Sequence, residues 1–210
     1  MPLPATHIKF ALDVKDKFDI KNLSEYLSGT VYPDSRFITK INRSCTHVSG
    51  LSLDDPSFSD FKKGWAVHCL CDKVQHQISD KYISDILEPL EKTDKRGGEW
   101  WVKHTALKII LDISVFKIYN IQKYLPMIEY VENANDENLE DIKNYIKIVQ
   151  KTYQDKQEIN LDDMKELWLS LGAEEELIEK VIKKTEEYLK DEKLVKRVEG
   201  LYEKMVGEVL

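Results

Sequence analysis

The chain has 210 residues, of which 42% are hydrophobic and 33% charged, and its formal net charge is −7. This length suits one globular domain, and the negative charge argues against general nucleic-acid binding, which needs clustered Lys and Arg. No apolar run reaches the roughly 18 residues that span a membrane, and the first residues lack the basic and apolar segments of a signal peptide.

The first half of the chain has helical periodicity with few strand signals. The second predicted helix should end at Gly29. Residues 30–37, "TVYPDSRF", are expected to be extended, because the residue before Pro33 is pushed out of the helical region. Residues 34–57 read mostly as loop, and 91–98 as a turn before the most apolar helix. The periodicity predicts helices over 6–17, 21–28, 59–77, 80–90 and 99–119.

The second half has a different character, because its helices are charged on one face and apolar on the other. They are expected within 132–153, 160–172 and 173–206. Asn160 followed by two aspartates favours a helix start. The whole chain therefore predicts a single all-helical domain, 1–210. We expect residues 1–121 to carry any metal site, since all five histidines lie at or before His104, and residues 122–210 to form a charged amphipathic half.

The segment "GWAVHCLCDKVQHQ", residues 64–77, holds several polar groups on one predicted helix. His68 and Asp72 are four residues apart, so their side chains share a face and can bind one divalent metal, or simply bond to each other. Cys69 and Cys71 point to different faces, and we expect both to pack in the core. The odd number of cysteines does not fit a secreted disulfide framework, which favours a reduced, cytoplasmic protein.

Three further polar residues precede this helix in an order that strengthens the metal interpretation. His7 sits among apolar residues of the first helix, Asp34 follows a proline in "VYPDS", and His47 lies in "CTHVSG". Each also has a local alternative, namely a hydrogen-bonding histidine, a helix cap and a loop histidine. Taken together with His68 and Asp72, the series indicates a metal site.

Four short blocks in the first third of the chain, residues 4–72, resemble the zinc-dependent phospholipase C-like family. The blocks are "PATHIKFAL", "GTVYPDS", "CTHVSG" and "FKKGWAVHCLCD". The resemblance implies an all-helical fold with one to three zinc or other divalent ions that hydrolyse phosphoesters. It also implies one metal bound by Asp34, His47, His68 and Asp72, with His7 reaching a neighbouring ion. Asp34 is the residue to which we also assign a catalytic role.

The chain departs from the family where a second helix should carry His-x-x-x-Glu. His104 is present, but Lys108 stands at the carboxylate position, and an ammonium repels a metal ion. Asp112, two turns after His104, is the substitute ligand that we predict there. His76, four residues after Asp72, is the candidate for a further family histidine.

The leading hypothesis is a metal-dependent hydrolase acting on a small-molecule or lipid-like phosphoester. Neither a membrane-binding helix nor an export signal favours phospholipid itself, and the oligomeric state stays open. The alternative is a non-catalytic helical metal-binding protein whose C-terminal helices bind a protein partner. His76, His104 and Lys108 discriminate between the two, since catalysis by a metal cluster needs them to face the first metal.

Overall fold

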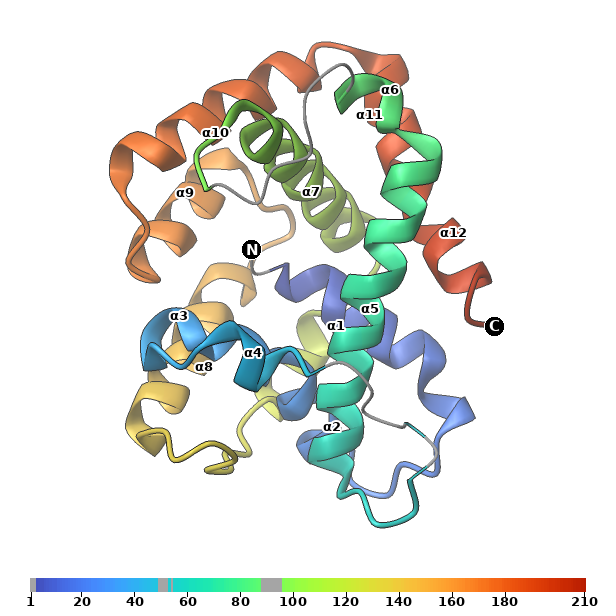
Figure 1. The fold of residues 1–210 in the computed structure, drawn as a ribbon, viewed down its shortest axis with the longest axis vertical. Helices are drawn as coiled ribbons and strands as arrows, with labels where there is room; N and C mark the ends of the chain where they lie inside the picture. The colour runs from blue at the N-terminus through green and yellow to red at the C-terminus, as the bar shows by residue number, and fades with distance from the viewer. Residues whose placement is uncertain (1–2, 49–52, 54, 88–95) are drawn as a thin grey trace.

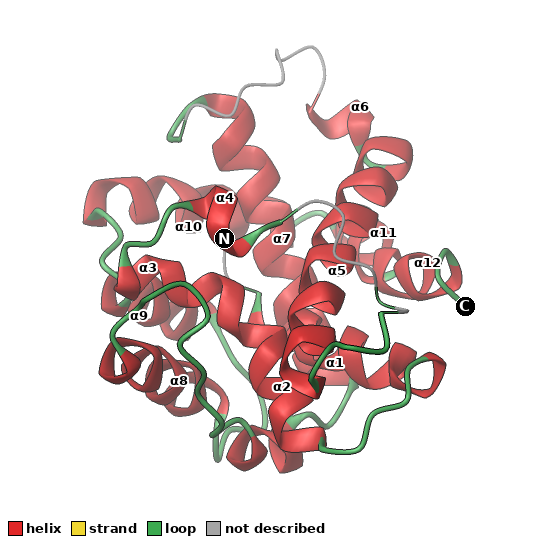
Figure 2. Cartoon of the chain, turned by 60° about the horizontal axis from the view of Figure 1, so that its bottom comes forward, coloured by secondary structure: helices red, strands yellow, loops and turns green. Residues whose placement is uncertain are grey.

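Helices and their connecting loops make up the part of the chain that the computed structural model describes, residues 3–48, 53, 55–87 and 96–210 (Figure 2). No strand occurs in this part, and its helices pack around one hydrophobic core. The predicted all-helical single domain is confirmed. None of the helices described is long and apolar enough to cross a membrane.

Three of the elements in the described residues are 3₁₀ helices, labelled η. In chain order they are α1 (Pro4–Val14), η1 (Lys15–Lys17), α2 (Leu23–Val31), η2 (Tyr32–Ser35), α3 (Arg36–Thr39), α4 (Arg43–Thr46), α5 (Asp60–Tyr82), α6 (Ser84–Leu87), α7 (Glu99–Ile118), η3 (Gln122–Met127), α8 (Leu139–Tyr153), α9 (Leu161–Ser170), α10 (Glu175–Leu189), α11 (Glu192–Glu199) and α12 (Leu201–Gly207).

Side-chain caps fix where several helices begin. The Asn22 side chain accepts hydrogen bonds from the Ser24 and Glu25 amides before α2, and Ser59 accepts one from the Lys62 amide before α5. Asn160 and Asp163 form a reciprocal capping box at α9, where the sequence predicts a helix start. These caps satisfy amides that a helix cannot bond internally.

Gly29 does not end the second helix, contrary to the prediction, because α2 continues to Val31. The glycine instead lets two helices touch: a Cβ on Gly29 would lie 2.0 Å from the Phe61 carbonyl oxygen of α5. The reciprocal contact is at Gly64, where a Cβ would lie 1.9 Å from the Tyr26 carbonyl oxygen. Helices α2 and α5 therefore cross backbone to backbone, which brings Thr30 against α5 (Figure 1).

The prediction of an extended 30–37 segment is also wrong. Tyr32, directly before Pro33, has helical backbone angles (φ −52°, ψ −44°), and the segment forms the end of α2, then η2 and the start of α3. Pro33 sits in the first turn of η2, where its missing N–H costs no hydrogen bond. The segment is buried, so packing outweighs the local preference of the residue before proline.

Other boundaries shift while the predicted helices remain. The helix predicted over 59–77 runs on to Tyr82, and only α6 follows it, with residues 88–90 and 91–95 outside the described part. The predicted loop 34–57 contains the one-turn helices α3 and α4. The apolar helix predicted over 99–119 is confirmed as α7, most of whose residues are buried.

The arrangement of helices places the first half of the chain around α5. In Figure 1, α5 runs down one side of the molecule, with α1 and α2 against its lower half and α7 to the left of its upper half. The C-terminal helices cover this core from outside: α10 and α11 pack on α7, and α12 packs on α5. The candidate ligands come from elements that meet around the middle of α5.

Candidate metal centre

Five predicted ligands lie together, although they come from four different segments. His7 is on α1, Asp34 on η2, His47 directly after α4, and His68 and Asp72 on α5. Their ligand atoms form two overlapping groups, His7–His68–Asp72 and Asp34–His47–His68, and within each group all atoms lie within 4.8 Å of one another. This division differs from the one that the family resemblance implies, because His68 belongs to both groups.

The imidazole Nε2 atoms and the Asp72 carboxylate face one another across short distances. His7 Nε2 lies 3.4 Å from Asp72 Oδ1, and His47 Nε2 lies 3.5 Å from Asp72 Oδ2. The Nε2 atoms of His47 and His68 are 3.3 Å apart. The rings of His7 and His68 are stacked, with their centroids 4.0 Å apart. Each of the two groups is compact enough for its three ligand atoms to share one ion.

The opposite ring nitrogen of each histidine is held by a group outside the cluster. His7 Nδ1 lies 2.9 Å from the Leu3 carbonyl oxygen, and His68 Nδ1 lies 2.8 Å from that of Thr30. A carbonyl oxygen only accepts, so each Nδ1 carries the hydrogen. The Nε2 atom of each ring is thereby turned into the cluster, which is how a metal-binding histidine is oriented.

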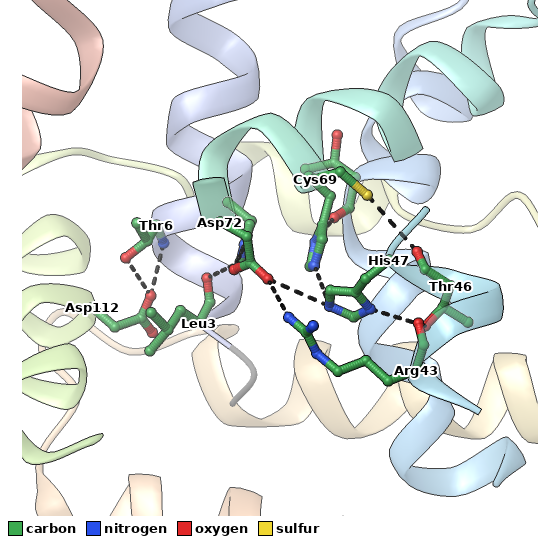
Figure 3. A network of polar contacts seen from close by, with 11 residues as sticks. Leu3, Thr6, Arg43, Thr46, His47, Cys69, Asp72 and Asp112 are labelled. Atoms are coloured by element: carbon green, nitrogen blue, oxygen red, sulfur yellow. Dashed lines mark hydrogen bonds and ion pairs between the residues drawn. The ribbon is translucent and has the colours of Figure 1, made fainter. Parts of the chain in front are cut away.

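His47 is oriented in the same sense by a side chain. Its Nδ1 lies 3.0 Å from Thr46 Oγ1, a hydroxyl that can donate or accept. Figure 3 shows this contact, with the far side of the ring turned toward Asp72. His7 Nε2 is buried without a hydrogen-bond partner. A buried ring nitrogen that lies 3.4 Å from a carboxylate oxygen and receives no hydrogen bond fits a cation ligand, so the residues suit a divalent metal.

The pKa values of the cluster point the same way. Burial lowers the pKa of His47 to about 4 and that of His68 to about 3, so both rings are neutral at physiological pH. Burial works against the Asp34 and Asp72 carboxylates, but the surrounding histidines outweigh it and lower both pKa values. Neutral imidazoles and ionised carboxylates are the protonation states that bind a metal ion.

His7 behaves differently from the other two histidines. Burial alone would lower its pKa, but the adjacent Asp72 outweighs burial and raises it. The cluster thus favours a positive charge at His7 Nε2, where two carboxylates and two neutral rings surround it. A bound metal ion would supply that charge without a proton.

A cavity of about 550 Å³ opens beside the cluster, and His47 and Asp72 form part of its wall. Asp34 is only 3% exposed and is not among the described residues that line the cavity. Arg43 reaches Asp72 at the rim, with Nη2 3.3 Å from Oδ2 (Figure 3). The full lining is Arg43, His47, Val48, Leu53, Ala66, Cys69, Leu70, Asp72, Lys73, His76 and Lys108.

Asp112, predicted as a substitute ligand, lies in a separate buried pocket. Its Oδ1 accepts hydrogen bonds from the Thr6 amide (2.7 Å) and hydroxyl (2.8 Å), and its Oδ2 accepts one from the Tyr153 hydroxyl (2.6 Å). Burial raises its pKa despite these bonds. Neither ligand group among the described residues includes Asp112.

His76 and His104 also lie outside the two ligand groups. His76 is exposed on α5 and borders the cavity, while His104 is mostly buried on α7. Their rings stack with centroids 5.4 Å apart, and Trp100 stacks on His104 at 4.6 Å. The structure therefore pairs these two histidines with each other, beside the cavity rather than in the cluster.

The cysteines are explained by packing. Cys71 is 1% exposed in the core, as predicted. Cys69 is half-buried, packs against the core and lines the cavity, with its thiol 3.8 Å from the Thr46 carbonyl oxygen.

Arg43 is a charged cavity residue that the sequence did not indicate, although it lies only four residues before His47.

No protein-family model, curated protein or solved structure matches the chain. The likeness to the phospholipase C-like family thus rests on the four sequence blocks, and the site must be interpreted from its own geometry.

Proposed function

We propose that this protein is a metal-dependent hydrolase of phosphoesters, with zinc or another divalent ion bound by His7, Asp34, His47, His68 and Asp72. The observation that carries the proposal is the cluster itself: three imidazoles and two carboxylates converge beside an open cavity with basic side chains. Imidazole nitrogen and carboxylate oxygen are ligands that zinc prefers. An anionic substrate fits the basic wall.

The cluster supports one ion rather than several. His68 belongs to both ligand groups, and its Nδ1 is occupied by the Thr30 carbonyl. Only its Nε2 lone pair is left, and one lone pair serves one ion. The residues predicted for further ions, His76, His104 and Asp112, lie outside both groups within the described chain.

A divalent ion bound here would polarise a phosphoryl oxygen and lower the pKa of a bound water. The protein's own residues do the rest. The carbonyls of Leu3 and Thr30 hold His7 and His68 in the ligand tautomer. Asp34, buried behind the cavity wall, adds negative charge that retains the ion, and Arg43 offers a guanidinium to a phosphate at the rim.

Metal analysis tests the binding half of the proposal. Protein purified without chelators should contain about one equivalent of divalent metal. His68→Gln should lower the metal affinity by more than about 100-fold, since it removes a ligand rather than an outer contact. His76→Gln, on the same helix, is the matched control and should keep its metal. A metal-free wild type, or loss of metal in both variants alike, would refute the site.

Hydrolysis assays test the catalytic half. The metal-loaded protein should hydrolyse an aryl phosphomonoester or phosphodiester, and Asp34→Asn should lower kcat/KM by more than about 100-fold through loss of the ligand charge. If the protein binds metal but hydrolyses neither substrate class, the non-catalytic alternative is correct and the enzyme proposal fails.

A further inference from the structure

Lys108 occupies the position where the family resemblance calls for a metal-binding carboxylate, and the structure shows where it points. It lies on α7, is half-buried, and lines the same cavity as Asp72 and His47. Its charge is close enough to contribute to the lowered pKa of Asp72. The ammonium therefore sits across the cavity from the proposed metal ligands on α5.

The cavity wall is strongly basic for a protein whose net charge is −7. Arg43, Lys73 and Lys108 line it, and Asp72 is its one carboxylate among the described residues. Arg43 already reaches Asp72. Lys73 and Lys108 have no carboxylate within salt-bridge distance in the described chain. Two unpaired ammonium groups at one cavity favour a ligand with two negative charges.

Phosphomonoesters and phosphodiesters differ in the charge of the phosphate group. A phosphomonoester carries about −1.5 to −2 at neutral pH, whereas a phosphodiester is a monoanion. Lys73 and Lys108 can balance the first but leave excess positive charge around the second. The basic wall thus matches the dianion better than the monoanion.

The remaining wall of the cavity is apolar. The cavity that Lys73 and Lys108 line is also lined by Val48, Leu53, Ala66 and Leu70. The volume of about 550 Å³ lies within the range of small-molecule sites. An organic group of modest size could bury its apolar surface there while its phosphate faces the lysines.

We propose that the cavity binds a phosphomonoester with a small apolar organic group, and that Lys108 is the substrate-binding cation that stands in for a second metal ion. Lys73 assists from the exposed edge of α5. This inference rests on the proposed function for the metal, but the anion contact with Lys108 can be measured separately.

Binding of two matched probes tests the inference by calorimetry. At a pH above its second pKa, phenylphosphonate is a non-hydrolysable dianion, whereas its monomethyl ester is the corresponding monoanion. The wild type should bind the dianion at least about 10-fold more tightly, since charge-assisted contacts are involved. Lys108→Met should weaken phenylphosphonate binding by about 10- to 100-fold, the loss expected of such a contact, with unchanged metal content. Lys73→Met should act in the same direction but less, because Lys73 is exposed.

Lys103→Met is the matched control on the same helix, since Lys103 pairs with Glu99 and does not line the cavity. It should bind both probes like the wild type. Equal affinity for the two probes, or wild-type binding by both Lys108→Met and Lys73→Met, would overturn the inference while leaving the metal proposal intact. A metal-free protein that still selects the dianion through Lys108 would refute the proposed function and support the anion site.

Discussion

Two carboxylates on either side of α1, one buried and one partly exposed at the cavity, have opposite surroundings, although neighbouring residues of that helix contact them. Thr6 contacts Asp112 (Figure 3). His7 faces Asp72. Asp112 accepts three hydrogen bonds of 2.6–2.8 Å from true donors. Asp72 instead meets His7, His47 and Arg43 at 3.3–3.5 Å.

The difference separates a structural carboxylate from a proposed metal ligand. Every described partner of Asp112 brings its own hydrogen, so the group is satisfied and needs no cation. Around Asp72, Arg43 is a donor at the rim, while the neutral rings of His47 and His68 bring lone pairs toward the carboxylate. Such an arrangement is costly unless a cation occupies it. Burial differs as well, since Asp112 is fully buried and 23% of the Asp72 side chain is exposed.

Replacing each of the two aspartates with asparagine should give the largest difference between the two sites, with metal affinity lost at one and fold stability lost at the other. Asp72→Asn should lower metal affinity by more than about 100-fold, because it removes a charged ligand, while it should change the melting temperature of the metal-free protein little. Asp112→Asn should keep the metal but destabilise the fold by about 1–3 kcal/mol, because a buried donor is left facing a donor. Metal titration and urea unfolding of both variants measure the two effects. Similar metal loss in both would abolish the distinction.

The sequence could predict the helices and the cluster because both depend on local patterns of residue type and spacing. Apolar periodicity predicts α7, and the asparagine with its following aspartates predicts the start of α9. The four-residue spacing of His68 and Asp72 places them on one face of α5. Residue types in order, together with the family resemblance, predict the three other candidate ligands, and the structure brings them to the same place.

The sequence could not predict what depends on distant partners. Gly29 carries no sign that Phe61 lies against it, so it was interpreted as a helix end. Asp112 is 106 residues from Thr6 and 41 from Tyr153, and only the fold brings these donors to it. Lys108 was interpreted as a lost ligand, since its access to the cavity depends on how α7 packs beside α5.

The pH dependence of stability should report the neutral histidines of the cluster. The folded pKa values of His47, about 4, and His68, about 3, lie below the ordinary 6.5. The unfolded chain therefore binds more protons below pH 6.5, and the stability that these residues contribute above 6.5 is lost as the pH falls. His7 has the opposite sign, because its pKa is raised and its contribution is lost as the pH rises.

Below pH 6.5 His7 is protonated in both the folded and the unfolded chain, so its contribution no longer changes, and the slope comes from His47 and His68. Metal-free protein should lose about 2–3 kcal/mol of unfolding free energy per pH unit between about pH 6 and pH 5, about 1.4 kcal/mol for each of the two protons. Urea unfolding at several pH values measures this slope, and His68→Gln should flatten it. A slope that is unchanged in His68→Gln would show that the neutral rings are not responsible.

The smallest expected difference between the two sites concerns the two threonines that contact them, each by a hydrogen bond. Thr46 holds Nδ1 of His47, and Thr6 donates to Asp112. Thr46→Val keeps the side-chain shape but frees the imidazole to rotate, so metal affinity should fall by about 10-fold, the lower end of losses for such supporting contacts. Thr6→Val should instead cost about 1 kcal/mol of stability, one hydrogen bond, with unchanged metal affinity. Competitive metal titration with a chelator and urea unfolding of both variants resolve effects of this size. If Thr6→Val weakens metal binding as much as Thr46→Val does, the two sides of α1 are coupled, and the Asp112 pocket must be counted as part of the metal centre.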